Sequence, residues 1–128
     1  MRLFPSELIE VRRSPGRGRG VFARQFIPEG TIIERVPLIV FPEKELETEE
    51  GFSALYNFVF EWGRGTVAIA LGCGSIYNHS YSPNARYDDA AQRTKVYTAI
   101  KDISAGEEIT INYNGDPDNY SPLEFAVL

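Results

Sequence analysis

Glycine and proline divide the apolar segments of this sequence into lengths too short for long helices. Four segments with alternating or β-branched patterns stand out, at residues 31–36, 66–71, 94–100 and 107–113. Short segments of this kind, bounded by turn residues, are typical of β-strands. Tight turns are expected at residues 26–30, 63–65 and 103–106. The sequence therefore predicts an irregular, mainly β domain with little helix.

Composition limits the class of protein. The 128 residues suffice for one domain with a real core and not for two, so we expect a single domain over residues 1–128. Apolar residues make up 43%, which indicates a globular chain. Eighteen acidic residues against thirteen basic ones give a net charge of −5. This charge argues against nucleic-acid binding and is compatible with a basic polypeptide as partner.

Cysteine and hydropathy predict the compartment. The single cysteine, Cys73, excludes a disulfide within the chain and a cysteine-rich zinc site. The first ten residues lack the apolar core of a signal peptide, and no apolar segment is long enough to cross a membrane. We therefore expect a cytoplasmic protein, nuclear if the source is eukaryotic, with no metal and no membrane contact.

Residues 14–24, Ser-Pro-Gly-Arg-Gly-Arg-Gly-Val-Phe-Ala-Arg, alternate glycine with arginine. Glycine permits close backbone approach, so exposed amides here could hold a ligand. Neither the dinucleotide fingerprint nor the phosphate loop fits the spacing. The alternative is a flexible turn that leads into a strand at residues 21–24.

Aromatic residues concentrate in residues 52–62. Phe58, Phe60 and Trp62 alternate, which favours a strand with one shared face. These rings either belong to the core or line a hydrophobic channel. The charged residues 42–50 before them predict the start of a short helix.

Residues 74–87 form the stretch on which the other segments converge. They contain the only histidine, His79, within a series of short polar side chains and a proline. Such side chains bond neighbouring backbone groups and compete with strand pairing. The stretch is too polar for an ordinary core element, and a polar segment between apolar strands is a common place for a functional site. The alternative is a surface loop.

With two other segments, this stretch resembles the SET domain, the fold of protein-lysine methyltransferases. Residues 78–84 read Asn-His-Ser-Tyr-Ser-Pro-Asn and match the family's Asn-His-Ser-x-x-Pro-Asn signature. Residues 18–22, Gly-Arg-Gly-Val-Phe, resemble its glycine-rich segment, and residues 27–33 continue it. Residues 106–113, Gly-Glu-Glu-Ile-Thr-Ile-Asn-Tyr, resemble the segment that ends in its catalytic tyrosine. Order and separation both fit, over a core of residues 7–113.

The resemblance implies a β-clip fold of several small twisted sheets. The central stretch and the last strand then thread together as a pseudoknot, an exception to the usual unthreaded connection. The resemblance also implies S-adenosylmethionine as methyl donor and a lysine side chain of a protein as acceptor, meeting in a narrow channel from opposite faces. Methyl transfer is an in-line displacement by a neutral amine, so aligning the reactants is the main task of such a protein.

The family's roles carry over to matching positions. Tyr113 corresponds to the catalytic tyrosine, whose hydroxyl orients the amine. The positions implied to bind the donor are Arg17, Gly18, Arg19, Asn78, His79 and Tyr113. On this interpretation His79 acts largely through its backbone and is neither a metal ligand nor a general base. Tyr87 corresponds to a residue that lines the lysine channel in some members, with a packed strand tyrosine as the alternative.

Two departures from the family leave questions open. Many relatives carry a cysteine-rich zinc segment after the catalytic tyrosine, and this sequence has none. Tyr120 and Phe125, in a tail at residues 114–128, would close the channel instead, or the substrate completes it. The sequence contains no separate substrate-docking domain, so the substrate, the number of methyl groups and the oligomeric state, a homodimer included, stay open. A catalytically silent module that binds a peptide or partner protein is the alternative to an enzyme.

Overall fold

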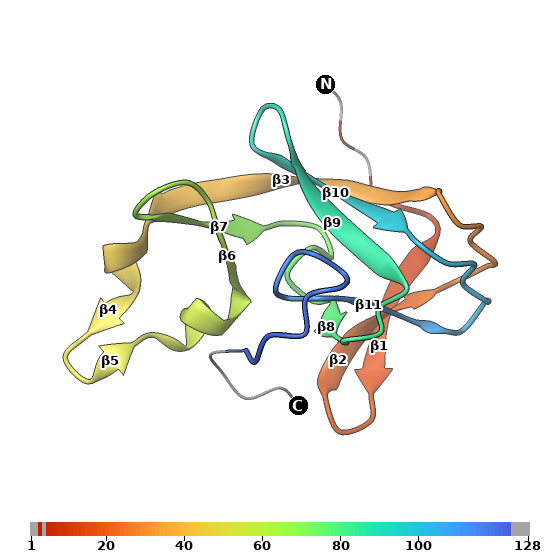
Figure 1. Ribbon diagram of the computed structural model, residues 1–128, viewed down its shortest axis with the longest axis horizontal. Helices are drawn as coiled ribbons and strands as arrows, with labels where there is room; N and C mark the ends of the chain where they lie inside the picture. Colours follow the sequence, from red (N-terminus) through yellow and green to blue (C-terminus); the bar gives the residue numbers. More distant parts are fainter. Residues whose placement is uncertain (1–2, 4, 124–128) are drawn as a thin grey trace.

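Short strands in three sheets dominate the secondary structure of the computed structural model, which describes residue 3 and residues 5–123 (Figure 1). The strands are β1 (Ile9–Ser14), β2 (Gly18–Ala23), β3 (Ile32–Pro42), β4 (Glu47–Thr48), β5 (Gly51–Phe52), β6 (Val59–Glu61), β7 (Thr66–Ala70), β8 (Asn78–His79), β9 (Ala85–Ala90), β10 (Thr94–Ala99) and β11 (Glu108–Ile111). Two 3₁₀ helices, η1 (Glu43–Leu46) and η2 (Ala54–Phe58), are the helices of the described residues. The fold class predicted from the sequence is confirmed. None of the helices described is long and apolar enough to cross a membrane.

The larger sheet has the strand order β6-β7-β3-β10-β9, and every neighbouring pair in it is antiparallel. Its long strand β3 runs across the top of the view in Figure 1 and pairs with β7 and β10. Because alternate residues of a strand face the same side, apolar residues of these strands gather on the inner face. The buried members are Val36, Leu38, Ala68, Ala70, Tyr97 and Ala99.

The second sheet has the order β1-β2-β11-β8, and its last pair is parallel. Asn78 lies opposite Thr110 and His79 opposite Ile111, and the Ser80 amide donates to the Ile111 carbonyl at 2.9 Å. The central stretch and the last strand therefore lie side by side, as the expected pseudoknot requires. The prediction that this stretch is too polar for the core is wrong at His79, which is only 4% exposed.

The glycine-rich segment is more ordered than a flexible turn. Gly18 pairs with Ser14 and Gly20 with Arg12, so residues 18–20 belong to β2, and only residues 15–17 form the turn. Strand β1 pairs with β2 along residues 18–23, and β11 pairs with Val21 and Phe22 on the other side.

The aromatic segment does not form the strand predicted from its alternation. Ser53 caps η2 by accepting a hydrogen bond from the Leu55 amide at 3.0 Å, so the first half of the segment turns. Strand β6 covers only Val59–Glu61, and Phe58 is 54% exposed. The short helix expected among the charged residues before it is present as η1.

Asn84 ties the central stretch to β11, and its loss should weaken the whole fold. Its amide nitrogen donates to the Glu108 carbonyl at 2.8 Å, and its amide oxygen accepts from the Thr110 amide at 2.9 Å. Because Asn84→Ala leaves these partners without a bond inside the protein, we expect about 2–4 kcal/mol less stability in urea unfolding. Asn57→Ala, on exposed η2, is the control and should change stability little. Equal effects of the two substitutions would contradict the role of Asn84.

Candidate functional site

Three predicted segments meet where β2, β8 and β11 lie side by side (Figure 1). An Arg17 guanidinium nitrogen donates to the His79 carbonyl at 3.0 Å. The Asn78 side-chain amide donates to the Arg19 carbonyl at 3.0 Å. Five of the six positions implied to bind the donor thus lie in one small region: Arg17, Gly18 and Arg19 from the turn and start of β2, and Asn78 and His79 from β8.

Glu108 holds this region together and is not among the predicted site residues. One carboxylate oxygen accepts from the Asn78 amide at 2.7 Å, and the other accepts from the Ser14 hydroxyl at 2.8 Å. A Cβ on Gly20 would lie 2.5 Å from that carboxylate, so only glycine lets it cross β2 here. The sequence signal for this role is the acidic pair in the Gly-Glu-Glu segment. The resemblance to the SET domain includes this pair but assigns no function to its second carboxylate.

His79 connects the central stretch to the backbone of Tyr113. Its Nδ1 accepts a hydrogen bond from the Tyr113 amide at 3.0 Å, so the ring is neutral with its proton on Nε2. Burial, and then the positive charge of Arg17, lower the pKa of His79. A neutral ring that already accepts a backbone bond is suited to positioning Tyr113.

Tyr113 presents a neutral hydroxyl whose proton has a fixed direction. The hydroxyl donates to the Tyr77 carbonyl at 2.6 Å, and its oxygen retains acceptor capacity. Burial raises the pKa of Tyr113 to about 12, with a smaller opposing effect from Arg17. Near neutral pH this phenol is therefore an orienting group and not a base.

Tyr87, the position that the resemblance assigns to the lysine channel, stands beside Tyr113. Its hydroxyl donates to the Tyr113 carbonyl at 3.3 Å. Burial raises the pKa of Tyr87 to about 12. Both tyrosines line a cavity of about 720 Å³, and Tyr77 lines it as well.

The C-terminal tail forms part of the cavity wall, but not through the predicted tyrosine. Pro122 and Leu123 line the cavity. Tyr120 is 68% exposed and lies against Tyr81, with ring centroids 6.2 Å apart, and it is not among the lining residues. Phe125 lies outside the described residues.

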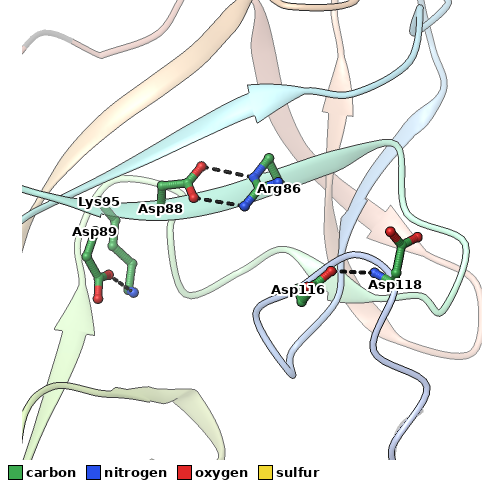
Figure 2. A network of polar contacts seen from close by, with 6 residues as sticks. All are labelled: Arg86, Asp88, Asp89, Lys95, Asp116 and Asp118. Atoms are coloured by element: carbon green, nitrogen blue, oxygen red, sulfur yellow. Dashed lines mark hydrogen bonds and ion pairs between the residues drawn. The ribbon is translucent and has the colours of Figure 1, made fainter.

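A buried lysine is the least expected feature of the cavity wall. Figure 2 shows the Lys95 ammonium against Asp89, on the neighbouring strand β9, at 2.5 Å. The ammonium also lies 4.5 Å from the ring centroid of Phe60 and 4.6 Å from that of Tyr87. Burial lowers the pKa of Lys95, which Asp89 partly opposes. The aromatic wall of this cavity therefore accommodates an alkyl-ammonium group, with a carboxylate to balance it.

Tyr113 belongs both to the cavity and to the region that Arg17, Asn78 and His79 form. Its side chain lines the cavity, and its backbone amide bonds His79, which belongs with Arg17 and Asn78 to a region that is not part of the cavity wall. A neutral hydroxyl between two binding regions can align a nucleophile in one with an electrophile in the other. Among the described residues, no cluster of histidine, cysteine and carboxylate side chains is placed to hold a metal ion.

Comparisons with known proteins point to one family. A family model described as the SET domain matches residues 18–114. The chain is 33% identical over 106 residues to the "Histone-lysine N-methyltransferase, H3 lysine-37 specific" of Schizosaccharomyces pombe, covering 82% of this chain and 72% of that protein. It is 29% identical over 140 residues to the histone-lysine N-methyltransferase set5 of the same yeast, covering 88% of this chain and 44% of that protein.

A solved structure shows the same fold. It is the crystal structure of a Plasmodium falciparum protein described as a candidate histone methyltransferase. The TM-score is 0.69 at 26% identity, over 87% of this chain and 95% of that one.

The protonation state of His79 is directly measurable, because the chain has one histidine. We expect its single imidazole signal in NMR to titrate below pH 6.5, since burial and Arg17 disfavour the charged ring. A lowered folded-state pKa means that the stability from this residue is complete above about pH 6.5 and is lost as the pH falls through the folded value. Arg17→Gln should move the signal toward higher pH, while Arg64→Gln, far along the chain in the β6–β7 turn, is the control. A wild-type pKa of 6.5 or higher would contradict a neutral Nδ1 acceptor.

Proposed function

We propose, because the chain belongs to the SET-domain family of protein-lysine methyltransferases, that it transfers a methyl group from S-adenosylmethionine to a lysine side chain of a protein. The observation that carries this proposal is the place of Tyr113. Its hydroxyl is fixed on the Tyr77 carbonyl beside an aromatic cavity, and its backbone is held by His79 at the junction of β8 and β11. We also propose that residues 7–113 are the catalytic core of a single domain.

The region around Arg17 and Asn78 suits a donor with a carboxylate and an adenine. Gly18 has a φ of +77°, and nothing lies within 4 Å of the place of a Cβ, so its backbone is open to a ligand. Arg17 adds a positive charge for a carboxylate. Both amide hydrogens of Asn78 already have acceptors in Arg19 and Glu108, so this residue would contact the donor through its amide oxygen and backbone. When bound, the donor supplies an electrophilic methyl group on a sulfonium.

The cavity would act on the acceptor lysine through burial. A free lysine has a pKa of about 10.4 and must lose its proton before it attacks. Burial away from water disfavours the ammonium, and burial likewise lowers the pKa of Lys95 in this wall. Tyr113 and Tyr87, both protonated near neutral pH, would then orient the neutral amine by hydrogen bonds.

A basic protein is the substrate class that we propose. The charged residues of the cavity wall are Glu43, Glu61, Asp89 and Lys95, which leaves an excess of carboxylates. Carboxylates at the mouth of a site attract basic segments. The relatives are named as histone-lysine methyltransferases, and histones are basic proteins of this kind.

A silent binding module is the alternative, and calorimetry with S-adenosylmethionine separates the two. An enzyme must bind the donor, whereas a peptide-binding module need not. Binding of a core-histone peptide without any heat of donor binding at high micromolar concentration would favour the module.

Tyr113→Phe should separate catalysis from binding. The substitution removes the hydroxyl and keeps the ring and the backbone bond to His79, so donor affinity in calorimetry should change little. Methyl transfer to core histones, followed with radiolabelled donor, should fall by about two powers of ten, the size typical of losing one transition-state hydrogen bond. Tyr120→Phe, on the exposed tail, is the matched control and should retain the wild-type rate. Full activity of Tyr113→Phe would assign catalysis to another residue.

Tyr87→Phe should change how many methyl groups the product carries. The Tyr87 hydroxyl reaches the Tyr113 carbonyl and lines the cavity, where it can hold a water or the amine. Its removal frees space in which a methylated amine can rotate, so the share of di- and trimethyl-lysine should rise while activity persists. Mass spectrometry of methylated histone over time measures this share. The same product distribution in wild type and variant would mean that Tyr87 only packs.

A further inference from the structure

A buried glutamate stands directly behind the candidate catalytic tyrosine. Tyr77 joins them, because its backbone carbonyl accepts from the Tyr113 hydroxyl at 2.6 Å and its own hydroxyl donates to Glu34 Oε1 at 2.8 Å. Tyr77 is 1% exposed and Glu34 is 7% exposed. One residue therefore connects a core carboxylate on β3 to the reacting centre.

This carboxylate is unusual because nothing in its surroundings balances its charge. Burial raises the pKa of Glu34, and the hydrogen bonds from the Tyr77 hydroxyl and the Cys73 backbone only partly oppose it. No salt bridge of the described residues includes Glu34. Burying a carboxyl group without a cation is costly, and an apolar residue would fit a core strand more cheaply. A leucine could provide neither of the hydrogen bonds that Glu34 accepts, from the Tyr77 hydroxyl and from the Cys73 backbone, and the bond from Tyr77 is the one that leads to Tyr113.

The surroundings leave Tyr77 little freedom apart from that bond. Its ring stacks on Tyr97 at 4.5 Å and 17° between planes. Gly72 closes over the glutamate, since a Cβ there would lie 3.2 Å from Glu34 Oε2. The stack holds the ring face, and the bond to Glu34 holds the hydroxyl end of the side chain.

We infer that Glu34 and Tyr77 are positioning residues for Tyr113, an inference that rests on the proposed methyltransferase function. Glu34 holds the Tyr77 side chain, and the Tyr77 side chain holds its own peptide carbonyl at the place where the Tyr113 hydroxyl donates. The direction of the Tyr113 proton then sets which way the oxygen lone pairs face. Loss of the bond lets the carbonyl drift, and a small misplacement of an aligning group lowers turnover more than binding.

Paired tyrosine variants separate positioning from simple stability. Tyr77→Phe removes the bond to Glu34, whereas Tyr97→Phe removes an equally buried bond, from Tyr97 to the Gly74 carbonyl at 2.8 Å, on the stacked ring. We expect turnover of core histones by Tyr77→Phe to fall about tenfold with donor affinity nearly unchanged, and that of Tyr97→Phe to stay near wild type. An equal fall in both variants, or none in Tyr77→Phe, would overturn the inference.

Glutamate variants test the acceptor itself. Glu34→Gln keeps a carbonyl oxygen for the Tyr77 hydroxyl and should retain most of the turnover. Glu34→Leu removes the acceptor and should match Tyr77→Phe. A Glu34→Leu variant that folds and turns over normally would contradict the inference.

A double-mutant cycle shows whether the effect passes through Tyr113. In the Tyr113→Phe background there is no hydroxyl to position, so adding Tyr77→Phe should lower the residual turnover no further. A further tenfold fall would mean a general structural role and would overturn the inference.

NMR of ring-labelled tyrosine gives a readout that does not depend on activity. The Tyr113 signal is identified by its absence in Tyr113→Phe. It should shift in Tyr77→Phe and Glu34→Leu and stay in place in Tyr97→Phe, and the opposite pattern would overturn the inference. If wild type transfers no methyl group while these shifts occur, the proposed function fails and the positioning of Tyr113 stands.

Discussion

The parallel pairing of β8 with β11 is the interaction on which the rest of the structure depends. It brings His79 next to Tyr113, 34 residues later in the sequence, and sets their hydrogen bond at 3.0 Å. Only two residue pairs connect these strands, so their backbone hydrogen bonds add little stability, and hydrogen bonds from side chains strengthen the pairing. The Asn84 side chain bonds a carbonyl and an amide of the β11 backbone, and the Asn78 amide bonds Arg19 and Glu108 across the adjoining strands. The polar residues of the central stretch thus stabilise the place where β8 and β11 pair, which we call the crossing.

The crossing explains why so many polar groups are buried near one point. A buried polar group without a partner costs stability, and the paired segments supply partners for the side-chain amides of Asn78 and Asn84 and for His79 Nδ1. Among the described residues, His79 Nε2 is the buried side-chain nitrogen that has no hydrogen-bond partner. Gly20 is needed because the Glu108 carboxylate passes over it, and His79 must be neutral because Nδ1 accepts a backbone bond. The same contacts that hold the crossing also fix the backbone of Tyr113. Stability and alignment are therefore properties of one hydrogen-bond network.

Local patterns in the sequence predict the strands and the three converging segments, because alternation and turn residues act over a few positions. They do not predict Lys95 inside the cavity wall or Glu34 in the core. Each is a charged residue at an inward position of a strand, and its burial depends on partners from other segments, Asp89 on β9 for one and Tyr77, just before β8, for the other. The resemblance places Tyr120 in the channel, as a substitute for the zinc segment that relatives carry after the catalytic tyrosine. In the structure Pro122 and Leu123 line the cavity, and Tyr120 lies against Tyr81. In a strand the side chains alternate between two faces, so the direction of a side chain follows from its position. In a loop there is no such period, and the direction cannot be predicted from the sequence.

Lys95 and Glu34 show how the fold tolerates charge near a site built for a neutral amine. The Lys95 ammonium has a carboxylate partner and aromatic faces, so its positive charge is balanced within the cavity wall. Glu34 has no cation, yet its negative charge is separated from the cavity by the Tyr77 ring. Glu43, Glu61 and Asp89 already line the cavity, and a further carboxylate facing it would add to the stabilisation of the ammonium form of an incoming lysine and oppose its deprotonation. Placed behind a tyrosine, the carboxylate fixes the position of a hydroxyl and leaves the aromatic wall to desolvate the amine.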